Sequence, residues 1–260
     1  MARAYSKGFD ALTHLDFPAF DGDREAVRSR ALAAGVMGWA VAGADPTQWD
    51  RLEEIVSRHG GLALLGVHPW WAADLDPSAL SPFLEDLARR PLAHGLGECG
   101  LDHHRSRDPA SRARQRHAFR AQLALARERD VPVVIHCVRA FGPLLRLCAA
   151  DGLPAAGGVI HGWSGPPDLV AEALGLGLHL SFGPQILRDR ARRARASLAA
   201  VPADRLLLET DCPDQAPPGI PRGEPAHLRE VAREAAAIRD TRPETLWSIT
   251  GDNARRLFRA

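Results

Sequence analysis

Five side chains that could bind a metal ion come at or just after short apolar runs of the chain. They are three imidazoles and two carboxylates: His14, Glu98, His136, His161 and Asp211. Imidazole and carboxylate groups bind zinc, manganese and magnesium, whereas softer metals prefer thiolates. The sequence therefore predicts a site for divalent ions and the hydrolytic chemistry that such ions support.

The elements that must position these residues alternate along the chain. Eight apolar or β-branched runs predict strands at Gly8 to Leu12, Val36 to Ala42, Leu62 to Gly66, Ala93 to Gly97, Pro132 to Ile135, Gly158 to Ile160, Leu178 to Phe182 and Arg205 to Leu208. Helical patterns lie between them, as at Asp23 to Ala34, Pro46 to His59, Pro77 to Arg90, Ser111 to Asp130 and Pro225 to Arg239. This alternation implies parallel crossovers. Eight units in 260 residues indicate an α/β fold, a single (β/α)8 TIM barrel over residues 1–260.

In such a barrel the carboxyl ends of all strands meet at one rim, where active sites of this fold lie. The five candidate ligands are therefore expected to share one pocket. Three cysteines, Cys99, Cys137 and Cys212, each directly follow a candidate ligand. Because successive residues of a strand point to opposite sides, we expect these thiols to pack against the barrel wall.

Composition and charge restrict the compartment and the partners. The chain is 45% hydrophobic, as expected for a globular protein. Because its net charge is only +1, no overall electrostatic attraction holds it on duplex nucleic acid or on a membrane. The four cysteines form no C-x-x-C pair, and from the amino-acid pattern we expect neither a secretory signal nor a membrane-spanning run. We expect a cytoplasmic protein without a membrane partner. The Arg-rich stretch Leu187 to Arg195 predicts an exposed helix.

Several short motifs occur in a familiar order: FDALTHLD, GVHPWW, GECGLD, PVVIHCVRA, IHGWSG, LLLETDCP, RGEP and a terminal T-x-x-N-x-x-x-LF. Together they resemble the TatD family of metal-dependent deoxyribonucleases over nearly the whole chain. The resemblance implies a barrel of the amidohydrolase type that hydrolyses phosphodiester bonds of DNA with one or two divalent ions, Mg²⁺, Mn²⁺ or Zn²⁺.

The resemblance also implies roles for the candidate ligands. Glu98 is similar to the carboxylate that contacts both ions, and His136 and His161 are similar to the imidazoles of one site. Asp211 matches the ligand of the other site and would also act as a general base, so Glu98 and Asp211 are the expected catalytic residues.

The first motif departs from the family pattern, which places H-x-H after the first strand. The first histidine is replaced by Leu12, and only His14 remains as a ligand. We therefore expect one tightly bound ion and one labile ion.

Further residues match family positions that line the substrate pocket. They are His68, Arg139, Glu209 and Arg222, of which the two arginines and His68 could donate to phosphate oxygens. The indole of Trp163, like those of Trp70 and Trp71, could stack on an unpaired base or pack within an apolar lid.

The leading hypothesis is a metal-dependent deoxyribonuclease that acts on single-stranded DNA ends, or on RNA, as an exonuclease. One alternative is a hydrolase of another bond, such as the ester of D-aminoacyl-tRNA, because one fold supports many reactions. Another is a catalytically weakened barrel that only binds nucleic acid. The retained ligand set argues against binding alone, because desolvated polar groups are costly without a role.

Overall fold

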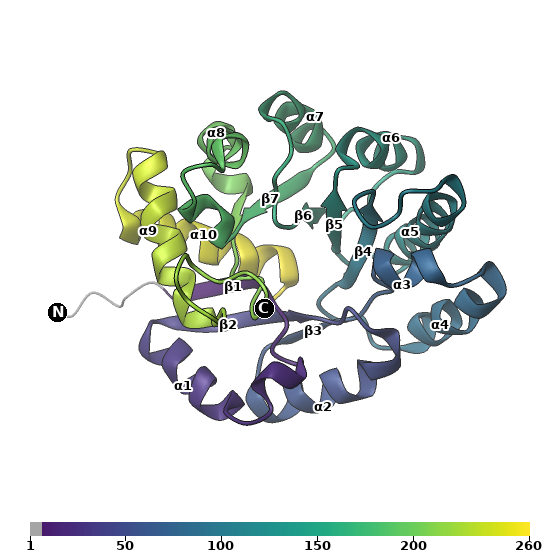
Figure 1. Cartoon of the computed structure of the whole chain (residues 1–260), viewed down its shortest axis with the longest axis horizontal. Coiled ribbons are helices and arrows are strands. Elements are labelled where there is room, and N and C mark those ends of the chain that lie inside the picture. The colour runs from purple at the N-terminus through teal and green to yellow at the C-terminus, as the bar shows by residue number, and fades with distance from the viewer. Residues whose placement is uncertain (1–6) are drawn as a thin grey trace.

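The computed structural model describes residues 7–260, in which the strands lie inside a ring of helices (Figure 1). Residues 1–6, which belong to the expected domain and to the segment expected to carry no secretory signal, lie outside the described residues. The strands are β1 (Gly8–Thr13), β2 (Val36–Ala42), β3 (Leu62–Leu64), β4 (Leu96–Asp102), β5 (Val133–Val138), β6 (Gly158–Ile160), β7 (Leu178–Phe182) and β8 (Leu206–Leu208).

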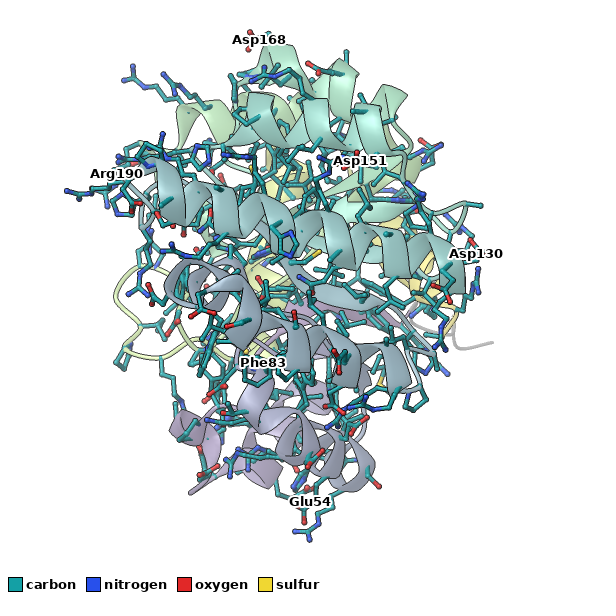
Figure 2. All side chains as sticks on the ribbon, turned by 90° about the vertical axis from the view of Figure 1, so that its right-hand side faces the viewer. Glu54, Phe83, Asp130, Asp151, Asp168 and Arg190 are labelled. Carbon is teal, nitrogen blue, oxygen red and sulfur yellow. The ribbon has the colours of Figure 1, made fainter. Side chains whose placement is uncertain are left out.

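Helices connect successive strands on the outside of the strands. They are α1 (Arg24–Ala33), α2 (Trp49–His59), α3 (Pro69–Asp74), α4 (Pro77–Arg89), α5 (Pro109–Arg129), α6 (Phe141–Asp151), α7 (Val170–Gly175), α8 (Arg192–Ala200), α9 (Leu228–Ile238) and α10 (Pro243–Phe258). Short 3-10 turns are η1 (Pro18–Phe20), η2 (Pro46–Gln48), η3 (Pro167–Leu169), η4 (Pro184–Leu187), η5 (Ala203–Arg205) and η6 (Pro225–His227). Charged side chains such as Glu54, Asp168 and Arg190 project from the periphery (Figure 2).

Two parallel ladders, β1-β2-β3 and β4-β5-β6-β7-β8, close into one barrel. At one seam the residue after β3, Leu65, accepts a backbone hydrogen bond from Gly97 of β4 at 2.9 Å. At the other seam Asp211, beyond β8, donates its backbone N–H to Leu12 of β1 at 2.9 Å. The predicted (β/α)8 barrel is therefore confirmed.

The barrel interior is filled by apolar side chains and closed at its amino-terminal end by α10. Phe258 at the end of α10 belongs to the same buried cluster as Phe9 of β1 and Leu207 of β8. The close approach requires a glycine in β1, because a Cβ on Gly8 would lie 1.9 Å from the indole of Trp247. With this end closed, only the carboxyl-terminal rim is left for a site.

Three strands extend beyond their predicted ends. β1 gains only Thr13, whereas the extensions of β4 and β5 correct the position of two candidate ligands. β4 was expected at Ala93 to Gly97 but runs over Leu96–Asp102, so Glu98 lies within it. β5 likewise runs to Val138, past His136. Cross-strand pairing with β5 continues through the GECGLD motif, so β4 does not end at Gly97. Gly100 is needed there because a Cβ would lie 2.0 Å from the carbonyl oxygen of His136.

The Arg-rich stretch after β7 is also corrected. Its first part forms an exposed turn that includes Arg188, and helix α8 begins only at Arg192. The expectation for the cysteines is confirmed, since Cys99, Cys137 and Cys212 are buried in the cluster between strands and helices. Within residues 7–260, no helix is long and apolar enough to cross a membrane.

Candidate metal centre

A cleft of about 420 Å³ at the carboxyl-terminal rim gathers all five candidate ligands. Its lining includes His14, Glu98, His136, His161 and Asp211. Two arginines, Arg105 and Arg188, also line it. The barrel thus joins residues from distant parts of the chain in one pocket, whose lining also includes two positively charged guanidinium groups.

Glu98 lies at the centre of the cluster and is 1% exposed. Its Oε1 atom is 3.2 Å from Nε2 of His14. Its Oε2 atom is 2.7 Å from Nε2 of His161 and 3.5 Å from Nδ1 of His136. Burial by itself raises the pKa of Glu98, but the surrounding imidazoles outweigh burial and hold the pKa well below its usual value. Glu98 is therefore an anion that faces both halves of the cluster.

The imidazoles of His136 and His161 direct one nitrogen each toward Glu98. Nδ1 of His136 lies 3.2 Å from Nε2 of His161. The other ring nitrogens lie near carboxylates, with Nε2 of His136 3.3 Å from Asp102 and Nδ1 of His161 3.5 Å from Glu209. Burial lowers the pKa of both imidazoles, but Asp102 and Glu98 raise the pKa of His136, and Glu98 and Glu209 raise that of His161, so the nitrogens that face Glu98 hold protons when no cation is bound. A cation can take the place of these inner protons while Asp102 and Glu209 keep the outer nitrogens protonated, and two imidazole nitrogens and a carboxylate oxygen then converge as ligands do.

Asp102 is held by several donors besides His136. Its Oδ2 atom accepts a hydrogen bond from the indole N–H of Trp70 at 2.7 Å. Its Oδ1 atom accepts from the backbone N–H groups of His104 and Arg105 at 2.8 and 2.9 Å. Burial raises the pKa of Asp102, but the hydrogen bonds from His136 and Trp70 outweigh it and lower the pKa below its usual value. Asp102 is therefore a fixed, ionised acceptor that orients His136.

His14 and Asp211 form the second half of the cluster. Nδ1 of His14 donates to the carbonyl of Ala42 at 2.8 Å, and Nε2 lies 3.3 Å from Oδ1 of Asp211. Burial lowers the pKa of His14, but the hydrogen bonds to Asp211 and Glu98 raise it well above its usual value. A proton at Nε2 thus lies between two carboxylates, at a place that a cation can take instead. The side chain of Leu12 is fully buried in the apolar interior and offers no ligand.

A buried aspartate fixes the strand ends that carry this half. Asp10, in the middle of β1, accepts hydrogen bonds from the backbone N–H and the hydroxyl of Thr210, next to Asp211. Burial raises the pKa of Asp10 well above its usual value. The contact ties β1 to the segment after β8 and so sets the spacing between His14 and Asp211.

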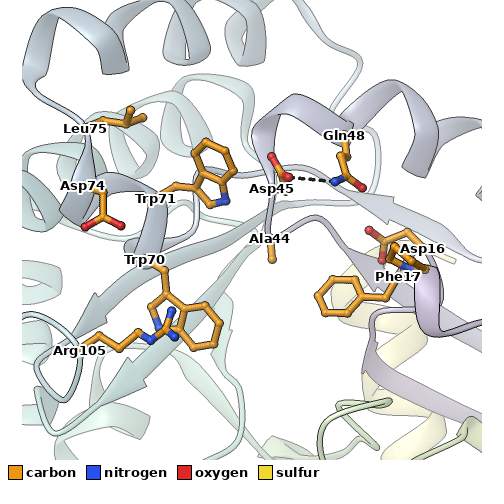
Figure 3. A pocket seen from close by; sticks show the side chains of 11 residues that line it. Asp16, Phe17, Ala44, Asp45, Gln48, Trp70, Trp71, Asp74, Leu75 and Arg105 are labelled. Carbon is orange, nitrogen blue, oxygen red and sulfur yellow. Dashed lines mark hydrogen bonds between the residues drawn. The ribbon is translucent and has the colours of Figure 1, made fainter.

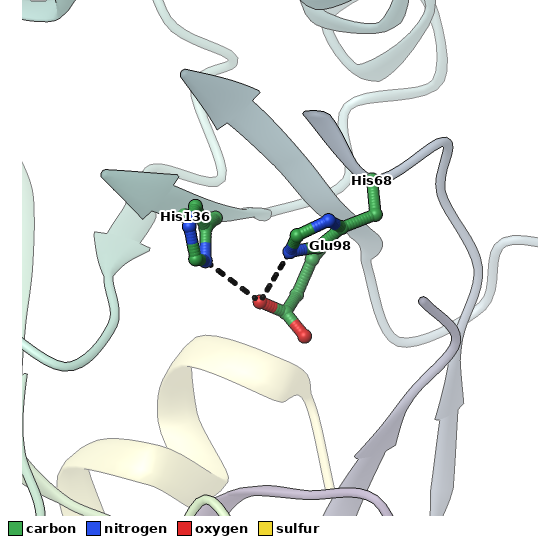
Figure 4. Close-up of side chains that lie close together, drawn as sticks. All are labelled: His68, Glu98 and His136. Carbon is green, nitrogen blue, oxygen red and sulfur yellow. Dashed lines mark ion pairs between the residues drawn. The ribbon is translucent and has the colours of Figure 1, made fainter. Parts of the chain in front are cut away.

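His68 lies against the cluster, with Glu98 and His136 (Figure 4). Its Nε2 atom is 3.7 Å from Oε2 of Glu98. Its Nδ1 atom accepts the backbone N–H of Trp70 at 3.2 Å and so caps the start of α3. Burial and the neighbouring His136 lower the pKa of His68 well below its usual value. A neutral ring that accepts at Nδ1 carries its proton at Nε2, so His68 presents a donor, not a lone pair, to the cleft.

The donor set fits one or two hard or borderline divalent ions. Glu98, His136 and His161 supply one carboxylate and two imidazoles, and His14 and Asp211 supply one of each beside the same Glu98. The buried Oε1 atom of Glu98 has only the 3.2 Å ion-pair contact with His14 and no hydrogen bond of good geometry among the described residues. A cation would compensate this buried carboxylate oxygen better.

Four predicted substrate contacts differ in the structure, of which Trp163 and Arg222 come first. The indole of Trp163 is completely buried against Phe141, with ring centroids 4.9 Å apart, so it has no free face for a base. The guanidinium of Arg222 forms ion pairs with Asp23 and Glu224 and lies outside the lining of the cleft.

The other two predicted contacts are placed as follows. Arg139 is exposed just beyond β5 and does not line the cleft either. Glu209 is fully buried, and its Oε1 atom accepts the backbone N–H of Gly162 at 2.7 Å. Its position beside His161 makes it a positioning residue for that imidazole rather than a substrate contact.

Sequence reasoning missed three contributors to the site. Asp102 stands in the quoted GECGLD motif, and Asp10 interrupts an apolar strand, which is itself a signal for a buried polar role. The indole N–H of Trp70 has no comparable signal, because its partner Asp102 is reached only across the barrel rim.

Comparison with known proteins agrees with this arrangement. The family described as TatD related DNase matches residues 9–259. A protein from Rahnella sp., named 3'-5' ssDNA/RNA exonuclease TatD, is 36% identical and aligns over 96% of this chain and 97% of its own. The uncharacterized metal-dependent hydrolase YabD of Bacillus subtilis is 33% identical over 96% of this chain and 98% of its own.

A solved structure shows the same fold. The crystal structure of YJJV, a TatD homolog from Escherichia coli, superposes with a TM-score of 0.90 at 29% identity and covers 98% of this chain and 99% of that one. The fold and the imidazole-carboxylate cluster define a metal-dependent hydrolase of ester bonds built on a (β/α)8 barrel. The chain belongs to the TatD-related DNase family, and it is a metal-dependent nuclease.

Proposed function

We propose that the protein removes nucleotides from the 3' ends of single-stranded DNA, or of RNA, with the help of one or two divalent ions. The observation that carries this proposal is the cluster around Glu98, which opens into a cleft that also carries arginines. The Rahnella relative is named for this activity, which supports the polarity and the single-stranded substrate.

We assign the ligands of one ion to Glu98, His136 and His161, and those of the other to His14, Glu98 and Asp211. The bound ions would polarise the scissile phosphodiester and lower the pKa of water, which is the chemistry such ions supply. Asp211 is only partly buried, at 15% side-chain exposure, so its Oδ atoms can take a proton from water as a general base. The Nε2–H of His68 faces the same space and can donate to a non-bridging phosphate oxygen.

The charge distribution favours a flexible strand over an intact duplex. The net charge is +1, so phosphate binding must be local. Arg105 and Arg188 line the cleft and are exposed, which places two cations beside the cluster. A strand end can enter such a cleft, whereas a duplex needs a longer basic surface. We propose the cytoplasm as its compartment, consistent with four free thiols, and one domain over residues 1–260.

The test uses metal-stripped protein and a single-stranded oligonucleotide labelled at its 5' end. We expect a ladder of shortened products when Mg²⁺, Mn²⁺ or Zn²⁺ is added, and none with Glu98→Ala. A 3'-labelled strand should release labelled mononucleotide at once. Release of labelled mononucleotide from the 5' end instead would contradict the polarity. An intact strand under every metal, with bound metal verified by mass spectrometry, would refute the nuclease proposal and favour an ester such as that of D-aminoacyl-tRNA.

A further inference from the structure

A second hollow adjoins the metal cleft and is not explained by metal binding. It has a volume of about 470 Å³ and shares four lining residues with the cleft, Phe17, Ala44, Trp70 and Arg105. Figure 3 shows the rings of Trp70 and Phe17 on either side of Ala44, with Trp71 nearby. The two spaces therefore adjoin along these side chains, and a chain bound at the metal centre can extend toward the hollow.

The lining of this hollow is aromatic and accessible. Trp70 is one of the few large apolar side chains that are exposed among the described residues, at 37%. Its N–H group is anchored by Asp102, which fixes the indole plane at the boundary of the two spaces. The guanidinium of Arg105 lies 4.2 Å from the Trp70 ring and has no ion-pair partner within residues 7–260. A planar ligand can replace this guanidinium on the ring at small cost, since the arginine is exposed.

Polar groups lie at the end of the hollow opposite Trp70. Asp16 lines this end and is 5% exposed; its Oδ1 atom has no hydrogen-bond partner among the described residues but is itself buried, so this oxygen does not face the hollow. The amide of Gln48 donates to Asp45 at 3.0 Å, which leaves its carbonyl oxygen available. The hollow thus combines an aromatic wall with hydrogen-bond acceptors, a pattern typical of sites that bind a flat heterocycle by its face and its edge.

We propose that this hollow binds one nucleobase next to the scissile phosphate, against the indole of Trp70, while Arg105 turns to the neighbouring phosphate. The inference rests on the proposed nuclease function and adds a subsite to it. The occupant follows from the lining that the hollow shares with the metal cleft, because the group attached to a phosphodiester of a nucleic acid is a nucleoside. Stacking of a base on an aromatic side chain is tolerant of sequence, which suits an enzyme that degrades any strand.

The experiment compares strands in which a single nucleotide is replaced by an abasic residue at each of the last four positions from the 3' end. The readouts are KM and kcat of the metal-loaded full chain, and the binding affinity of the Glu98→Gln protein in the same metal buffer. We expect one abasic position to raise KM or weaken binding roughly 10-fold, the range of one base stacked on an aromatic ring. In Trp70→Leu the same abasic replacement should change either value less than twofold.

Two further variants separate stacking from other effects. Trp70→Phe loses the hydrogen bond to Asp102 but keeps an aromatic face, so it should retain sensitivity to the abasic position. Met37→Ala removes another exposed apolar side chain, on β2 and outside both spaces, and should behave as the parent.

The outcomes distinguish this proposal from the nuclease proposal. If strands are cleaved but no abasic position carries a penalty, or if Trp70→Leu keeps the penalty, the subsite is refuted and the nuclease function stands. If no strand is cleaved but binding to the Glu98→Gln protein depends on one base and on Trp70, the nuclease function fails and the base site stands.

Discussion

Replacing Asp102 by asparagine removes one charge beside the metal centre and reverses the proton position on His136. In the native protein both oxygens of Asp102 accept hydrogen bonds, from Trp70 and His136 on one side and from two backbone N–H groups on the other. The asparagine NH₂ group must face donors in either orientation. The repulsion between facing donors is smallest when the proton of His136 moves from Nε2 to Nδ1. Nε2 then accepts a hydrogen bond from the asparagine NH₂ group.

That shift places a proton on the nitrogen that lies 3.5 Å from Glu98 and 3.2 Å from Nε2 of His161. The lone pair required of a ligand is then missing. Loss of a group that orients a metal-binding histidine typically lowers metal affinity about 10- to 100-fold, or roughly 1.4 to 2.7 kcal/mol. We expect Asp102→Asn to fall in the upper part of this range, because a ligand atom is blocked as well as misoriented.

The assay is calorimetric titration of metal-stripped protein with Mn²⁺ or Zn²⁺. Asp214→Asn is the matched control, because Asp214 lines the same cleft but is exposed and forms no ion pair with an imidazole among the described residues. It should bind metal as the parent does. Metal affinity of Asp102→Asn within twofold of the parent, in a protein that unfolds at the same temperature, would refute the assigned tautomer of His136.

Three other predictions follow from single residues. Leu12→His should raise the number of tightly bound ions per chain toward two, measured by metal analysis after dialysis; an unchanged ratio would show that the family's missing histidine does not limit the second site. Burial, with Arg205 nearby, lowers the pKa of His179 to about 4, so the unfolded chain binds the proton first and stability should fall as the pH drops from 6.5 toward 4. The loss should be smaller in His179→Gln, by up to about 3 kcal/mol, when urea unfolding is followed at both pH values, and equal losses in the two proteins would contradict it. Gly8→Ala should cost at least about 1 to 3 kcal/mol because of the clash with Trp247, whereas Gly22→Ala, with nothing within 4 Å, should cost little in the same unfolding assay; similar stabilities would contradict the close contact.

The barrel and its ligands could be predicted because both have local signals. Strand and helix periodicity is a property of neighbouring residues, so eight alternating units were recognisable from the chain itself. The sequence did not predict that His136 and Glu98 lie within strands rather than at their ends. The pairing of β4 with β5 extends both strands past these residues.

The substrate side of the site was harder to predict than the metal side. Trp163 and Trp70 have similar positions after strands, yet the structure buries the first completely and leaves the second 37% exposed. Likewise Arg222 is paired with Asp23, from a helix start far away in the sequence, and so is not available to a phosphate in the cleft. Exposure and pairing of a side chain depend on which distant segments cover it, and no local pattern encodes that.

The sequence by itself determined the fold class, the types of ligand and their order along the chain, since these follow from periodicity and residue chemistry. Only the tertiary structure decided how each imidazole is used. The carbonyl of Ala42, the carboxylate of Asp102 and the backbone N–H of Trp70 assign the protons of His14, His136 and His68, respectively. A histidine is a ligand at the nitrogen that lacks a proton and a donor at the other, so its role is set by neighbours that the folded barrel alone brings together.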